Sequence, residues 1–191
     1  MMVIDSGDKL WNLVSKEPID ELQLKESTRE LLQESLFVKH LPFVRCVIFI
    51  ATPHRGSFIA GWRPSQWITR FIKLPGNVLL GIADLLQESQ QELAFASTGG
   101  RIPTSVDNMT PWNPFIKTLA RIPIAPDVSA HSIIAVKEGM PVEKGNDGVV
   151  SYKSAHLENV ESEYVVRSPH SCQANPHTIA EVRRILLQQL K

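Results

Sequence analysis

Asp147 and His170 are the residues of this sequence whose types and surroundings best suit joint chemistry. Asp147 lies in the run Gly145-Asn146-Asp147-Gly148, and His170 lies in the later run Ser168-Pro169-His170-Ser171. A carboxylate that orients an imidazole is the acid–base half of a nucleophilic triad, in which the second ring nitrogen takes the nucleophile's proton. A plainer interpretation also stands. Glycines around Asn-Asp are a strong turn signal, and His170 could simply be exposed.

Three short apolar runs could position these two side chains. Residues 45–51, 131–136 and 163–167 are rich in β-branched residues and predict buried parallel strands. The Asp147 loop follows the second run, and the His170 loop follows the third. Open α/β sheets place their ligands at the carboxyl ends of the strands. We therefore expect Asp147 and His170 at the same edge of one sheet.

Helical patterns fill much of the remaining sequence. Residues 1–14 resemble a helix without a cap residue before it, and residues 27–38 form a second helix that begins with a Ser27–Glu30 capping box. The stretch from about 58 to 127 mixes helical patterns with Pro and Gly breaks, which predicts an inserted helical layer. Strands separated by helices predict an α/β domain with about three parallel strands.

A final amphipathic helix is expected from Pro176 to Leu190, because proline is favoured in the first helical turn. Its apolar residues recur at helical spacing and predict one buried face, formed by Ile179, Val182, Ile185 and Leu186.

Composition excludes several classes of function. Hydrophobic residues make up 43% and charged residues 21%, the balance of a soluble globular protein. Twenty basic and twenty acidic residues cancel without forming a block, which argues against nucleic-acid binding. No run approaches the roughly 18 apolar residues of a membrane span. The first five residues do not resemble a signal peptide, so the default expectation is the cytoplasm.

The cysteines predict neither disulfides nor a metal site. Cys46 opens an apolar run and is expected to be a small buried hydrophobe, and Cys172 is the second cysteine. Cys172 and His177 lack the second ligand pair that zinc requires.

The runs around these residues resemble a known family. Val47–Ser57, with Thr52-Pro53-His54-Arg55-Gly56-Ser57 at its end, resembles the strand and loop that follow the nucleophile unit of lipase-like α/β-hydrolases. Residues 145–157 resemble that family's catalytic-acid loop, and residues 168–176 resemble its histidine loop. The order Asp then His is also the family's. The resemblance implies hydrolysis of hydrophobic esters through an acyl-enzyme, with His170 as general base, Asp147 as its orienter and no metal or organic cofactor.

One family motif is missing from this sequence. The nucleophile of the family sits in a G-x-S-x-G elbow, which does not occur here. The nearest run, Gly56–Gly61, has the wrong spacing, and Ser57, Ser129 and Ser132 lack an elbow. The resemblance thus implies the C-terminal half of the hydrolase sheet. The serine and oxyanion donors are then expected before Met1, and residues 1–14 would be the later part of the helix that follows the elbow.

Three interpretations of the missing serine remain open. The chain is a fragment of a normal serine hydrolase, an inactive binding or interaction protein, or one half of a split enzyme whose partner is the missing N-terminal half. The first is favoured because Asp147 and His170 both stand intact in their runs. Two nearby residues, His54 and Arg55, could bind a phosphate, but packing of their own turn is the preferred interpretation. His156 is expected to pack a loop.

Overall fold

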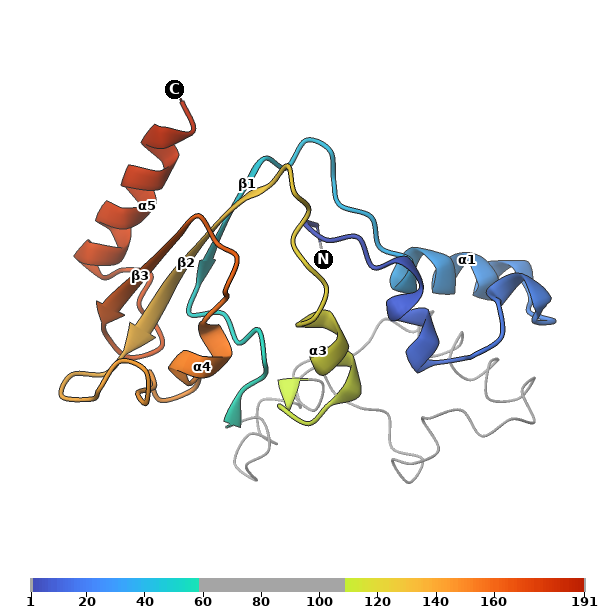
Figure 1. The fold of residues 1–191 in the computed structure, drawn as a ribbon, viewed down its shortest axis with the longest axis horizontal. Coiled ribbons are helices and arrows are strands. Elements are labelled where there is room, and N and C mark those ends of the chain that lie inside the picture. The colour runs from blue at the N-terminus through green and yellow to red at the C-terminus, as the bar shows by residue number, and fades with distance from the viewer. Residues whose placement is uncertain (1, 59–108, 191) are drawn as a thin grey trace.

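The computed structural model describes residues 2–58 and 109–190. In these residues three parallel strands form one sheet in the order β1-β2-β3, with helices around it, so the protein is of the α/β class (Figure 1). The strands are β1 at Cys46–Ile50, β2 at Ser129–Val136 and β3 at Ser162–Arg167. The predicted insert lies mostly outside the described residues, and its described part contains helix α3 at Pro114–Leu119.

The central strand, β2, is the most buried part of the molecule. Every residue of β2 after Ser129 is buried, whereas β1 is only half-buried along its whole length. The register pairs Ile48 of β1 with His131 of β2, and His131 with Ser162 of β3. A parallel strand with a neighbour on each side and cover on both faces loses contact with water, which explains the apolar run of residues 133–136 at the end of β2. Cys46, expected to be buried, is half-buried because it belongs to β1.

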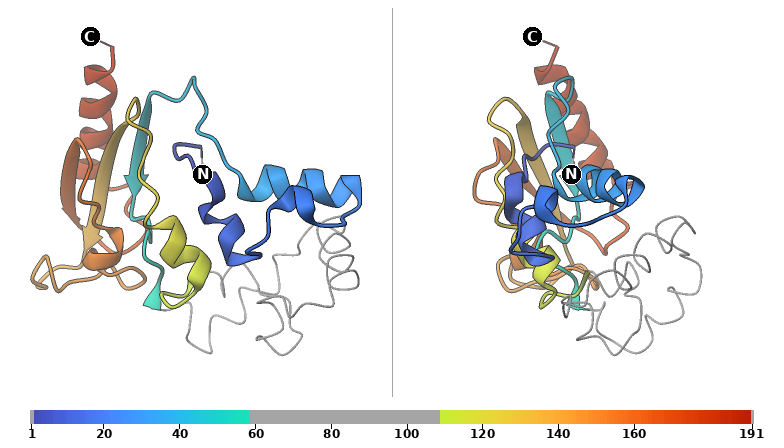
Figure 2. Two further views of the ribbon diagram at one scale, coloured as in Figure 1. Left: turned by 45° about the vertical axis from the view of Figure 1, so that its right-hand side comes forward. Right: turned by 90° about the vertical axis from the view of Figure 1, so that its right-hand side faces the viewer.

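Helices cover the two faces of the sheet. Helix α5, Pro176–Gln188, lies on one face, and the short helix α4, Tyr152–Ala155, lies on the other (Figure 2). The cluster under α5 is formed by Ala51, Ile133, Ala135, Val166 and Cys172, with Val182 packed against it. The cluster beside α4 is formed by Ile134, Val136, Val150 and Ala155.

The predicted buried face of α5 is only partly correct. Ile185 is fully buried and Val182 packs on the sheet, but Ile179 and Leu186 are 55% and 53% exposed. Thr178 is the other buried residue of the helix. Since consecutive residues are about 100° apart around a helix, the face at 178, 182 and 185 turns Ile179 and Leu186 away from the sheet. The start of the helix is as expected, with Pro176 in the first turn and the Asn175 side chain accepting a hydrogen bond from the His177 N–H.

The predicted helix over residues 1–14 is wrong. This segment instead contains two short 3-10 helices, Gly7–Lys9 and Trp11–Leu13. Gly7 has a φ of +49°, which a regular helix does not allow, and the Ser6 hydroxyl donates a hydrogen bond to the Leu36 carbonyl at 2.8 Å. Val3, Ile4 and Leu10 of this segment pack with Ile122, Ala125 and Val128 in a separate hydrophobic cluster.

The second helix begins earlier than predicted, and its capping box is absent. Helix α1 covers Glu26–Leu36, with Lys25 as the cap residue and no side-chain cap hydrogen bond. The backbone N–H groups of Thr28 and Arg29 both donate to the Lys25 carbonyl, so Ser27 already lies inside the helix. A third 3-10 helix, Ile19–Glu21, precedes α1, and Figure 1 shows α1 beyond β1, away from the sheet.

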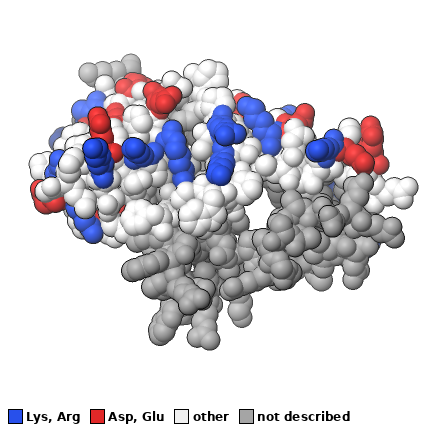
Figure 3. Space-filling model, turned by 60° about the horizontal axis from the view of Figure 1, so that its bottom comes forward, with Lys and Arg blue, Asp and Glu red and all other residues white. Residues whose placement is uncertain are grey.

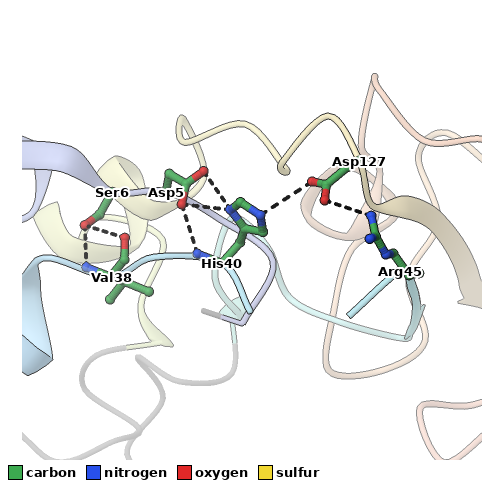
Figure 4. Close-up of polar contacts among 6 residues, drawn as sticks. All are labelled: Asp5, Ser6, Val38, His40, Arg45 and Asp127. Atoms are coloured by element: carbon green, nitrogen blue, oxygen red, sulfur yellow. Dashed lines mark hydrogen bonds and ion pairs between the residues drawn. The ribbon is translucent and has the colours of Figure 1, made fainter. Parts of the chain in front are cut away.

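A chain of polar contacts ties the N-terminal segment to the start of the sheet (Figure 4). The ring of His40 lies between two carboxylates, with Nδ1 2.9 Å from Oδ2 of Asp5 and Nε2 3.6 Å from Oδ1 of Asp127. Arg45 then approaches Asp127 at 3.3 Å. Hydrogen bonds from the backbone and the ring of His40 lower the pKa of Asp5.

Candidate active site

Asp147 is held in the loop that follows β2, and its side chain is only 1% exposed. Its Oδ1 accepts hydrogen bonds from the N–H groups of Val149 at 2.8 Å and Val150 at 2.7 Å. Gly148, with a φ of +100°, lets the chain turn back sharply enough for both donors to reach the carboxylate. The expected turn is therefore present, and it uses one of the two carboxylate oxygens.

The other carboxylate oxygen meets His170. Nδ1 of His170 lies 2.8 Å from Oδ2 of Asp147, so the two residues meet at one edge of the sheet, as predicted. The backbone N–H of His170 also donates to the Asp147 carbonyl at 3.0 Å. The loops after β2 and β3 are thus joined by both backbone and side chain. A buried carboxylate at Nδ1 favours the tautomer that carries its proton on Nδ1.

The side of the His170 ring that carries Nε2 is available for proton transfer. The side chain is 39% exposed, in contrast to the buried Asp147. Among the described residues nothing forms a hydrogen bond with Nε2 of His170. With Nδ1 protonated, Nε2 carries the free lone pair and can accept a proton. The pair has the geometry of an oriented general base.

Behind the pair lies the fully buried thiol of Cys172. Burial raises the pKa of this thiol. The thiol is therefore kept protonated at neutral pH. Cys172 packs under α5 as part of the core and has the inert character of a buried structural cysteine.

The turn after β1 is bonded to the segment that follows Asp147. The Arg55 guanidinium donates to the carbonyls of Lys153, at 3.1 Å, and His156. The Ser154 hydroxyl donates back to the Gly56 carbonyl at 2.5 Å. The expectation that Arg55 packs its own turn is therefore too narrow, because Arg55 also joins that turn to the acid loop. These hydrogen bonds, between segments that lie far apart in the chain, were not predicted from the sequence.

His54 is packed inside the same turn. Its ring lies edge-on to Phe49, with the ring centres 4.5 Å apart, and its Nε2 is buried without a partner among the described residues. Burial, with a smaller contribution from the adjacent Arg55, lowers the pKa of His54 to about 4. A neutral, packed ring agrees with the structural role expected for His54.

Another histidine–carboxylate contact occurs beside α4. Nδ1 of His156 lies 2.6 Å from Oε2 of Glu163, and the Tyr152 hydroxyl donates to Oε1 of Glu163 at 2.6 Å. The hydrogen bond to Glu163 and burial raise the pKa of Tyr152 to about 12. The rings of Tyr152 and His156 stack, with centres 5.4 Å apart. Because Glu163 belongs to β3, this cluster holds α4 against β3. His156 packs its loop, as expected.

The remaining candidate nucleophiles lie in unsuitable places. Ser129 begins β2, and Ser132 is buried in the middle of that strand, so neither stands on a strand-to-helix turn. Ser57 is 5% exposed, and its hydroxyl donates to the Val149 carbonyl at 2.6 Å. Over residues 2–58 and 109–190, no group of three metal-ligating side chains comes together.

Figure 3 shows the side of the molecule toward which the strands point. Lys and Arg side chains form a row across the described part of this side, with Asp and Glu mostly toward its margins.

Comparison with models of known protein families gives no match for this chain, and comparison with curated proteins gives none. No helix of the described residues is long and apolar enough to cross a membrane.

Proposed function

We propose that this chain supplies the acid and the base of a serine hydrolase that cleaves hydrophobic esters. The observation that carries the proposal is the contact between Oδ2 of Asp147 and Nδ1 of His170, at 2.8 Å, on a histidine side chain that is 39% exposed. Both residues follow neighbouring parallel strands, where α/β sheets place their active sites. The resemblance to lipase-like α/β-hydrolases, in three runs that occur in the family's order, supports the same reaction.

In the proposed reaction, Nε2 of His170 takes the proton of a serine hydroxyl while the serine oxygen attacks the ester carbonyl carbon. The imidazolium then gives that proton to the departing alkoxide oxygen, which leaves an acyl-enzyme. Water attacks the acyl carbon with the same proton transfers and releases the acid. Asp147 stabilises the imidazolium in both steps without taking the proton. The scheme uses no metal or organic cofactor.

The serine and the oxyanion donors come, in this proposal, from residues outside this sequence. No G-x-S-x-G run occurs in the 191 residues. Among the described residues β1 has a strand partner only on its β2 side and stays half-buried throughout, which fits a sheet that continues beyond β1. We propose that this half-sheet is the C-terminal part of an α/β-hydrolase.

The test begins with the reading frame upstream of codon 1. We expect an in-frame G-x-S-x-G run upstream, and we expect protein from the extended frame to hydrolyse a short p-nitrophenyl ester. It should react with a fluorophosphonate probe, whereas the 191-residue chain should not. His170→Ala in the extended protein should lower kcat by about 10⁴-fold or more, because the serine loses its base.

Two outcomes would contradict this proposal. Probe labelling of the 191-residue chain itself would mean that the nucleophile lies within it. An upstream frame closed by a stop codon, with no hydrolysis in any mixture with a separately encoded elbow-bearing chain, would favour an inactive binding protein.

A further inference from the structure

One peptide unit in the acid loop is held at both of its ends. The peptide bond between Val149 and Val150 presents its carbonyl to Ser57, whose hydroxyl donates to it at 2.6 Å. Its N–H donates to Oδ1 of Asp147 at 2.7 Å. A peptide bond is planar, so its C=O and N–H directions are fixed relative to each other. Holding the carbonyl therefore also aims the N–H at the Asp147 carboxylate.

The hydroxyl that holds this peptide is itself well fixed. Ser57 is 5% exposed, and its backbone N–H donates to the Met109 carbonyl at 2.8 Å. Gly56 before it has a φ of +84°, and a Cβ at that position would lie 2.6 Å from the Met109 carbonyl oxygen. The turn consequently packs tightly against the chain at Met109, and Ser57 reaches the acid loop from a rigid position.

We propose that Ser57 is a positioning residue for the Asp147–His170 pair, an inference that rests on the proposed function for its catalytic meaning. Ser57 fixes the peptide unit that donates to Oδ1 of Asp147, and this fixes the direction of Oδ2 toward His170. A hydroxyl donor on the carbonyl also polarises the peptide and strengthens its N–H as a donor. Supporting bonds of this kind determine whether a catalytic group is held in its productive geometry.

A second buried serine in the same contact provides a matched control. Ser154 is 6% exposed, and its hydroxyl donates to the Gly56 carbonyl, so it also joins the turn after β1 to the acid loop. Among the described residues it forms no hydrogen bond with the peptide units that donate to Asp147. Loss of either hydroxyl should weaken the contact between the loops, but only loss of the Ser57 hydroxyl should disturb the Asp147–His170 pair.

The experiment compares Ser57→Ala, Ser154→Ala and the unchanged chain by NMR. We expect the Val150 amide to exchange with solvent about tenfold faster in Ser57→Ala, the size expected from loss of one hydrogen bond. The Nδ1–H signal of His170 should broaden in the same variant. Both should stay at their original values in Ser154→Ala. Should Ser57→Ala not fold, Ser57→Cys keeps the shape of the side chain with a larger atom and a weaker donor, and the same acceleration at Val150 is expected.

Unchanged Val150 exchange and an unchanged His170 signal in the folded Ser57 variant would overturn the positioning role, as would equal effects of the two serine substitutions. The NMR measurements do not depend on hydrolysis. They can therefore support or contradict the positioning role of Ser57 even if the proposed hydrolase function proves wrong. In a hydrolytically active extended protein, Ser57→Ala should lower kcat by about 10- to 100-fold with KM unchanged. Ser57→Thr, which keeps the hydroxyl, should restore much of that loss, and absence of this rescue would contradict the proposal.

Discussion

At the scale of single residues, Asp147 uses its two carboxylate oxygens for two different purposes. Oδ1 accepts the two backbone N–H groups of its own loop, and Oδ2 faces His170. The turn interpretation and the acid–base interpretation of Asp147 were alternatives in the sequence, but the structure shows that the turn and the contact with His170 occur together. The two backbone donors hold the carboxylate in place, so that Oδ2 stays directed at the half-buried ring of His170.

His54 should make the stability of the fold depend on pH. Its pKa is lowered to about 4 from the ordinary 6.5, so between these values the unfolded chain takes up a proton that the folded chain does not. The free energy of unfolding should therefore fall as the pH drops from 7 to about 4. His54→Gln should remove this contribution, which urea denaturation of both proteins at pH 7.5 and 4.5 can measure.

The control for His54 is His177→Gln, which removes an exposed histidine of α5. Only the His54 variant should narrow the difference in unfolding free energy between the two pH values. A difference as large in His54→Gln as in the unchanged chain would show that His54 is not buried in its neutral form.

At the scale of secondary-structure elements, the local sequence determines the strands better than the helices. Parallel strands that need burial on both faces leave a continuous apolar run, and β1, β2 and β3 all appear close to their predicted positions. The helix predicted over residues 1–14 does not form because Ser6 and Gly7 take part in contacts and turns that hydrophobic periodicity does not indicate. The buried face of α5 was misjudged because its apolar residues extend further around the helix than the face that meets the sheet.

Two isoleucines of α5 allow this face to be tested. Ile185 is fully buried, whereas Ile179 is 55% exposed. Ile185→Ala should lower the free energy of unfolding by about 2–5 kcal/mol, because it leaves a cavity between α5 and the sheet. Ile179→Ala should change it by only about 0.5 kcal/mol. Equal losses in chemical denaturation would mean that α5 is rotated from the orientation described.

At the scale of the whole molecule, the sequence predicted the class of fold and the meeting of Asp147 with His170. Both follow from one inference, namely that loops after neighbouring parallel strands leave the sheet at the same edge. The bond from Ser57 to Val149 joins residues 92 positions apart, and no local pattern indicates it. The contact of His40 with Asp5 and Asp127 likewise depends on three segments that meet only after folding.

The most direct test of the central claim is the tautomer of His170, measured from its ring ¹⁵N chemical shifts at neutral pH. If Asp147 orients His170 as the base of a hydrolase, Nδ1 carries the proton and Nε2 the free lone pair. Asp147→Asn should shift the equilibrium away from this tautomer. A His170 ring protonated mainly on Nε2, or ring shifts that do not change in Asp147→Asn, would contradict the account.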